Sequence, residues 1–158
     1  MTETIHIVPI TKTHAEAIAT WVYDDIYAFY NHDKDFVEEC MDGNHFAFTD
    51  ADGALLGYLC FGQEARIPTR EADAYSDDFL DIGLHMKPDL TGRKLGGVFL
   101  QQCLDFAREN FGVSHFCATI ASFNSRAIAL CTRAGFSIER EVTHLHSGKK
   151  FTIVKRDA

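Results

Sequence analysis

Residues 80–100, LDIGLHMKPDLTGRKLGGVFL, carry more structural information than any other part of the chain. A strand is predicted over residues 79–86, and Pro88, which cannot donate a ladder hydrogen bond, ends it. A short turn with glycine then leads into a predicted helix over residues 92–110. The N-terminus of a helix has unpaired N–H groups and a partial positive charge, and glycine lets a phosphate approach them. This order of strand, turn and helix is therefore a candidate site for a phosphate group.

Two interpretations of the glycines in this turn stay open. Gly92, Gly96 and Gly97 either admit a phosphate or only allow tight packing. Arg93 and Lys94 favour the phosphate, because they place positive charge there in a chain whose formal net charge is −8. The spacing excludes two common nucleotide sites, since neither G-x-x-x-x-G-K-[ST] nor G-x-G-x-x-G is present.

The residues before this segment predict strands and short helices. Residues 4–10 alternate apolar and polar side chains as a strand does. Thr13 and Glu16 form a predicted capping box for a helix over residues 14–22. The sequence DADG at residues 50–53 predicts a hairpin turn. A second short helix is expected at residues 35–41, strands at 45–49 and 54–61, and a loop at 63–77.

The residues after it complete the sheet. Asn124 is a predicted N-cap for a helix that ends near residue 134, and Gly135 follows where a C-terminal glycine is expected. Further strands are predicted at residues 115–121, 136–145 and 149–155. The predicted order, β-α-α-β-β-β-α-β-α-β-β, describes a mixed α/β fold with one mostly antiparallel sheet of about seven strands and about four helices. The predicted apolar stripe of the long helix comprises Leu95, Val98, Phe99, Cys103 and Phe106.

Composition limits the class of protein. The chain has 158 residues, 46% hydrophobic and 24% charged, so we expect a single folded domain over residues 1–158. It has no run of Lys and Arg, which argues against nucleic-acid binding. It has no apolar run long enough for a membrane span and no leader pattern, so a cytoplasmic location is expected. The number of cysteines, five, is odd, and no two are spaced as C-x-x-C. This pattern predicts reduced thiols, with neither a disulfide framework nor a metal site.

Two segments resemble motifs of the GNAT superfamily of N-acetyltransferases. Residues 91–96, TGRKLG, are similar to the acyl-CoA motif Q/R-x-x-G-x-G/A, with Thr91 and Lys94 departing from it. Residues 124–136, NSRAIALCTRAGF, are similar to N-x-x-A-x-x-L-Y-x-x-x-G-F, with Cys131 at the Tyr position. Because both motifs occur in the family's order and the elements agree along the chain, the chain is identified as a member with the splayed sheet of that fold.

The resemblance implies acetyl-CoA as cosubstrate and an amine as acceptor. The amine would attack the thioester directly in a ternary complex, without an acyl-enzyme. No metal is implied. Backbone groups of Leu84, His85 and Met86 would pair with the pantetheine arm, and Asn124 would lie against that arm. The pyrophosphate would be held by the segment of Thr91, Gly92, Arg93, Lys94, Leu95, Gly96 and Gly97.

The resemblance leaves the catalytic groups open. Members often use a Glu base and a Tyr acid, but this chain has Thr119 at the Glu position of one branch and Cys131 at the Tyr position. Cys131 is interpreted as a buried helix cysteine, a general acid or, least favoured, a nucleophile. Asp81 and His85 are candidate bases, which even spacing places on one face of a strand. Either could also be solvated or structural.

The acceptor site is predicted from the first helices. Tyr23, Asp24, Tyr27 and Tyr30 would line it, with Glu64, a further candidate base, contributing from the loop; the alternative is that the aromatic residues form core. The expected acceptor is a small amine or a peptide N-terminus, and the expected assembly a monomer or homodimer with no nucleic acid or membrane partner. The rival hypothesis is an acyl-CoA-binding sensor or partner module with impaired catalysis.

Overall fold

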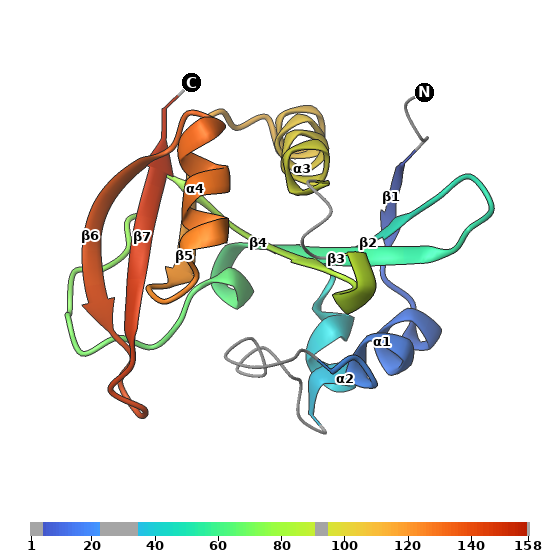
Figure 1. The fold of residues 1–158 in the computed structure, drawn as a ribbon, viewed down its shortest axis with the longest axis horizontal. Helices are drawn as coiled ribbons and strands as arrows, with labels where there is room; N and C mark the ends of the chain where they lie inside the picture. The colour runs from blue at the N-terminus through green and yellow to red at the C-terminus, as the bar shows by residue number, and fades with distance from the viewer. Residues whose placement is uncertain (1–4, 23–34, 91–94, 158) are drawn as a thin grey trace. The chain divides into compact units, whose positions relative to one another are not determined.

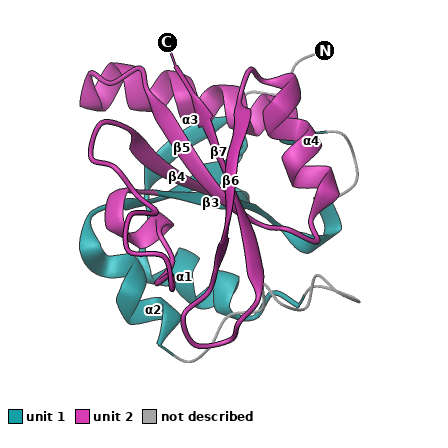
Figure 2. Ribbon diagram, turned by 90° about the vertical axis from the view of Figure 1, so that its left-hand side faces the viewer, with its two compact units in different colours: residues 1–60, 84–96 teal, residues 61–83, 97–158 magenta. Residues whose placement is uncertain are grey.

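The computed structural model describes residues 5–22, 35–90 and 95–157. These residues divide into two compact units (Figure 2). Unit 1 comprises residues 1–60 and 84–96, and unit 2 comprises residues 61–83 and 97–158. A single domain over residues 1–158 stays a prediction, so each unit is described by itself.

The described elements follow the predicted order (Figure 1). The strands form one mixed, open sheet in the order β1-β2-β3-β4-β5-β7-β6. Four α-helices lie within the described residues. The strands are β1 (His6–Pro9), β2 (His45–Thr49), β3 (Leu55–Phe61), β4 (Leu80–Met86), β5 (Phe116–Ala121), β6 (Ser137–Thr143) and β7 (Lys150–Arg156), and the helices are α1 (Lys12–Ala19), α2 (Phe36–Glu39), α3 (Gly96–Phe111) and α4 (Ser125–Arg133).

The β2–β3 hairpin of unit 1 confirms the predicted turn. The carboxylate of Asp50 accepts hydrogen bonds from the backbone N–H groups of Asp52 and Ala54, both at 2.9 Å. Gly53 has a φ of 86°, a left-handed conformation that glycine adopts without steric cost. The strands pair antiparallel, and β1 pairs with β2 in the same sense.

The first helix begins earlier than the sequence predicts. Thr11, not Thr13, is its N-cap, and its hydroxyl accepts a hydrogen bond from the N–H of His14 at 3.0 Å. His14 Nδ1 accepts in turn from the N–H of Thr11 at 3.2 Å, so a histidine completes the capping box in place of Glu16. Helix α1 packs with α2, which a 3₁₀ turn at Cys40–Asp42 extends. The core of this unit contains Ala15, Ile18, Trp21, Phe36, Cys40 and Tyr58.

Unit 2 contains residues 80–83 of β4, the strands β5, β6 and β7, helix α3 from Gly97 on, and helix α4. Strand β5 pairs parallel with β4 and antiparallel with β7, and β7 pairs antiparallel with β6. The apolar stripe of α3 is displaced from the predicted one, because Val98 is 39% exposed. The buried residues of α3 are Phe99, Leu100, Cys103, Leu104 and Ala107.

Helix α4 starts and ends as the sequence predicts. The side chain of Asn124 accepts a hydrogen bond from the N–H of Ala127 at 3.1 Å. Gly135 follows the helix with a φ of 96°. Helix α4 contacts both β6 and β7. The polar loop predicted at residues 63–77 begins instead with a 3₁₀ turn at Gly62–Ala65.

All five cysteines are buried, and none forms a disulfide. No helix among the described residues has the length and apolar character needed to cross a membrane.

Candidate functional site

The parallel pairing of β4 with β5 stops in the middle of both strands. The paired rows join Leu80–Ile82 to residues 116–118. The next residues, Gly83 and Thr119, both described, do not form a further pair. Strand β5 nevertheless continues to pair with β7 as far as Ala121. Backbone groups in the interior of a sheet require partners, so this point favours binding of another extended chain or ligand.

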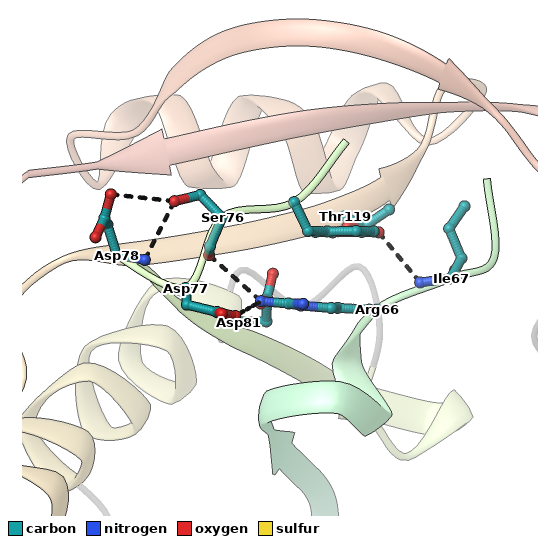
Figure 3. A network of polar contacts seen from close by, with 8 residues as sticks. Arg66, Ile67, Ser76, Asp77, Asp78, Asp81 and Thr119 are labelled. Carbon is teal, nitrogen blue, oxygen red and sulfur yellow. Dashed lines mark hydrogen bonds and ion pairs between the residues drawn. The ribbon is translucent and has the colours of Figure 1, made fainter. Parts of the chain in front are cut away.

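The segment that connects β3 to β4 contacts both β4 and β5 near the end of their pairing through its side chains. We call residues 62–78, which connect β3 to β4, the strap. Figure 3 shows its central ion pair: Arg66 Nε donates to Asp81 Oδ2 at 2.6 Å. A second nitrogen of the Arg66 guanidinium donates to Asp77 Oδ1 at 3.2 Å and to the carbonyl of Ser76 at 3.3 Å. The strap is thereby fixed to β4.

The strap also contacts β5 at Thr119, the first residue beyond the rows that are paired with β4. The hydroxyl of Tyr75 lies 2.8 Å from Thr119 Oγ1. The backbone N–H of Ile67 donates to the same tyrosine hydroxyl at 3.1 Å. The guanidinium carbon of Arg66 lies 5.0 Å from the centre of the Tyr75 ring, within the range of a cation–π contact. A phenol and an alcohol are therefore held together where β5 parts from β4.

The carboxyl of Asp81 is the most deeply buried charged group of this cluster. It is 2% exposed, and Oδ1 has no hydrogen-bond partner among the described residues. Burial raises the pKa of Asp81, although Arg66 opposes that rise. Cys117 is the partner of Asp81 in the β4–β5 pairing. Burial, with the negative charge of Asp81, raises the pKa of the Cys117 thiol to about 12, so this cysteine is protonated at neutral pH.

Further contacts fix the strap to the β6–β7 hairpin. Both carboxylate oxygens of Glu71 accept from the backbone N–H of Thr143, at 2.8 and 2.9 Å. The backbone N–H of Arg70 donates to the carbonyl of the same threonine at 2.9 Å. Arg140 forms an exposed ion pair with Asp73 at 3.2 Å. The strap is therefore bound to three strands of unit 2.

His85, a predicted base and cofactor contact, lies in unit 1. Its ring stacks on the buried ring of Tyr58, with centroids 4.6 Å apart and planes at 8°. The backbone of β4 is also close to β3, because the N–H of Lys87 donates to the carbonyl of Leu56 at 2.9 Å. A Cβ on Gly57 would lie 2.5 Å from the carbonyl oxygen of His85. Glycine is thus required for this approach of the two strands.

The other predicted cofactor residues are only partly described. Gly96 and Gly97 form the first turn of α3. A Cβ on Gly97 would meet the side chain of Leu130 at an ordinary 3.9 Å. Asn124 caps α4, as described above; a contact with the cofactor stays a prediction. Thr91, Gly92, Arg93 and Lys94 lie outside the described residues, as do the predicted acceptor-site residues Tyr23, Asp24, Tyr27 and Tyr30.

The remaining predicted groups lie in different surroundings. Cys131 is buried in α4, and burial raises the pKa of its thiol to about 11. Glu64 is exposed in the 3₁₀ turn at the start of the strap. Asp81 is bound to Arg66. Catalytic or acceptor-binding roles for these residues stay predictions.

Sequence reasoning missed Arg66 and Tyr75. The strap was predicted only as a polar loop, and neither residue belongs to a motif. The available signal was a lone tyrosine between acidic and small residues, in the sequence ADAYSDD at residues 72–78. That pattern does not identify its partner, because Thr119 is 44 residues away in the chain.

Comparison with known proteins places the chain in a family. The sequence model of the acetyltransferase (GNAT) family matches residues 15–136 of this chain. No curated protein matches in sequence. Similar solved structures include a GNAT-family acetyltransferase from Bacillus anthracis, with a TM-score of 0.73 and 14% identity over 97% of this chain and 94% of that one.

Two further structures share the fold. One is a spermidine N-acetyltransferase SpeG chimera from Vibrio cholerae and hSSAT, with a TM-score of 0.71 and 14% identity over 97% of this chain and 95% of that one. The other is yncA from Salmonella typhimurium with its cofactor acetyl-CoA, with a TM-score of 0.66 and 18% identity over 99% and 94%. At these identities the likeness shows the fold alone. The family model covers most of the chain, and the chain therefore belongs to the GNAT acetyltransferase family.

Proposed function

We propose that the chain is an acetyl-CoA-dependent N-acetyltransferase that moves an acetyl group to an amine by direct attack in a ternary complex. The observation that carries this proposal is the end of the β4–β5 pairing at Ile82 and Ala118. An extended ligand with amide groups can supply hydrogen bonds to a strand that has lost its neighbour. The pantetheine arm of CoA is such a ligand, and the GNAT family is one that uses it.

The proposed cofactor contacts follow the chain from β4 to α4. Backbone groups of Leu84, His85 and Met86 pair with the pantetheine arm, and Asn124 lies beside it. The N-terminus of α3 at Gly96 supports the pyrophosphate, because its first N–H groups have no partner within the helix. The segment of Thr91, Gly92, Arg93, Lys94, Leu95 and Gly97 completes this site. When bound, acetyl-CoA supplies the thioester, and the protein orients it.

The proposed acceptor is a small amine or a peptide N-terminus. The net charge of −8 favours approach of a cationic amine over long range. The fold is shared with a spermidine N-acetyltransferase, which makes polyamines suitable first probes. Tyr23, Asp24, Tyr27, Tyr30 and Glu64 are the proposed acceptor-site residues. We also propose a cytoplasmic location, since five free cysteines suit a reducing compartment.

The experiment has two steps on one sample. Acetyl-CoA binding is measured by calorimetry, with excess ATP as competitor, and free-thiol release is then followed with a panel of amines that includes spermidine. We expect binding that ATP does not reduce, and thiol release that depends on an amine. Binding without release from any amine would instead favour the rival acyl-CoA-binding module.

A variant tests the proposed pyrophosphate site. Gly96→Asp places a carboxylate at the N-terminus of α3, where the pyrophosphate is proposed to bind, and we expect it to abolish acetyl-CoA binding. The matched control is Asn110→Asp, which adds the same charge at the exposed opposite end of α3. Equal affinity of Gly96→Asp and wild type would remove this assignment.

A further inference from the structure

The hydroxyl of Tyr75 lies where chemistry is expected if the proposed function holds. Its partner Thr119 is the first residue of β5 beyond the last row paired with β4. The two oxygens are 2.8 Å apart. Thr119 is only partly buried, so a ligand can approach this pair of hydroxyls. All of these residues belong to unit 2.

The hydrogen bonds orient the phenol. The N–H of Ile67 can only donate, so the Tyr75 oxygen accepts at that side. A phenol oxygen can accept from the Thr119 hydroxyl as well, which leaves the single phenol proton for a third group. Burial raises the pKa of Tyr75, so the hydroxyl carries its proton at neutral pH.

The ring of Tyr75 is held as firmly as its hydroxyl. The Arg66 guanidinium lies against the ring, and the buried carboxylate of Asp81 fixes that guanidinium at 2.6 Å. A positive charge on the ring face also stabilises negative charge that develops on the phenol oxygen. The arrangement thus combines a proton donor with support for its conjugate base.

We propose that Tyr75 is a further catalytic residue of the acetyl transfer, whose hydroxyl protonates the sulfur of the departing CoA, with Arg66 as a positioning residue. This inference rests on the proposed function. The amine nitrogen forms a bond to the thioester carbon, and the carbon–sulfur bond then breaks with its electron pair on sulfur. Sulfur takes the proton of Tyr75, and the proton lost from the amine nitrogen restores the phenol through water. The products are the N-acetyl amine and CoA thiol.

Two other weak acids of the described residues are less suited to this step. Tyr58 is buried between the rings of Phe36 and His85 in unit 1. The Cys131 thiol is buried in α4, whereas Tyr75 and Thr119 are only partly buried.

The test is Tyr75→Phe, which keeps the ring on Arg66 and removes only the hydroxyl. We expect kcat to fall roughly 100-fold, the usual scale of general acid catalysis, while the acetyl-CoA Kd from calorimetry changes less than about two-fold. We also expect the solvent deuterium isotope effect on kcat to be present in wild type and absent in the variant. Thr119→Val, which removes one hydrogen bond to the phenol, should give a smaller loss of kcat.

A second variant does not depend on removal of the hydroxyl. Incorporation of 3-fluorotyrosine at position 75 alone makes the phenol more acidic, so the alkaline limb of the kcat–pH profile should move to lower pH. An unmoved profile, or a Tyr75→Phe enzyme with wild-type kcat, overturns the assignment of Tyr75 but leaves the proposed function intact. Failure of the wild type to acetylate any amine overturns both.

Discussion

The β2–β3 hairpin and the strap show two ways in which this chain fixes an irregular segment. The hairpin turn is held by Asp50, whose carboxylate binds backbone groups two and four residues away. The strap is held by Arg66–Asp81, Tyr75–Thr119 and Glu71–Thr143 contacts, which span 15, 44 and 72 residues. The hydrogen bonds of the hairpin turn are local and exposed, so water can partly replace them. The strap contacts join residues far apart in the chain, and Asp81 at their centre is buried. Loss of the Arg66–Asp81 pair should therefore lower the free energy of unfolding by more.

Loss of the central ion pair should give the largest effect. Arg66→Met keeps the apolar stem but leaves the carboxylate of Asp81 buried without its ion-pair partner. Removal of one partner of a buried pair typically costs about 3–5 kcal/mol. Urea unfolding at pH 7 measures this loss. The matched control is Arg140→Met, which breaks the exposed pair with Asp73 and should cost no more than about 1 kcal/mol. Equal losses in the two variants would contradict the comparison.

The pH dependence of that loss has a definite sign. Burial raises the pKa of Asp81 while Arg66 lowers it, so in Arg66→Met the carboxyl binds a proton at higher pH than in wild type. A folded-state pKa above the unfolded value means that this group stabilises the fold less as pH rises through both values. The deficit of Arg66→Met should therefore be largest above the pKa of Asp81 in the variant, shrink as the pH falls from that value to the wild-type pKa, and stay constant below it. A deficit that grows at lower pH would be inconsistent with this cause.

In the β2–β3 hairpin, a substitution in strand β3 should lower stability more than one in the turn. A Cβ on Gly57 would lie 2.5 Å from the backbone carbonyl oxygen of His85, which cannot move as a side chain could. Gly57→Ala should cost about 2 kcal/mol, within the usual range for overpacking. Gly97→Ala is the control for stability, because its Cβ would lie at an ordinary contact distance of 3.9 Å from the side chain of Leu130. Thermal unfolding of the two variants should separate them, and an unaffected Gly57→Ala protein would show that β3 and β4 can part without cost.

A local cap should give the smallest effect. Asn124→Ala removes the hydrogen bond to the N–H of Ala127, and such a cap contributes about 1 kcal/mol. Asn124→Ser keeps a capping oxygen and should retain most of the stability. If Asn124 also contacts CoA, as proposed, both variants should weaken acetyl-CoA binding while only Asn124→Ala loses stability. Normal affinity in both would leave Asn124 as a cap alone.

Local sequence signals account for most of the fold. Asp50 and Asn124 act on neighbours within four residues, so their roles could be predicted from the sequence. The first helix shows the limit of such rules. The sequence predicted a capping box of Thr13 and Glu16, whereas the N-cap is Thr11 and the side chain of His14 completes its capping box.

The strap could not be predicted because its contacts depend on strand register. Asp81 and Thr119 meet the strap only after β4 and β5 pair, and no local pattern encodes that pairing with Arg66 or Tyr75. Only part of the candidate active site could therefore be predicted. The α3 N-terminus follows from a sequence motif, whereas the hydroxyl pair of Tyr75 and Thr119 was found only in the structure.

Transfer of an isotopically labelled acetyl group tests the central claim most directly. Acetyl-CoA with a deuterated acetyl group is incubated with the wild-type protein and an amine, and both products are measured by mass spectrometry. We expect labelled N-acetyl amine in the same amount as released CoA thiol. Release of CoA without acetylated amine, or no release from any amine tested, would contradict it.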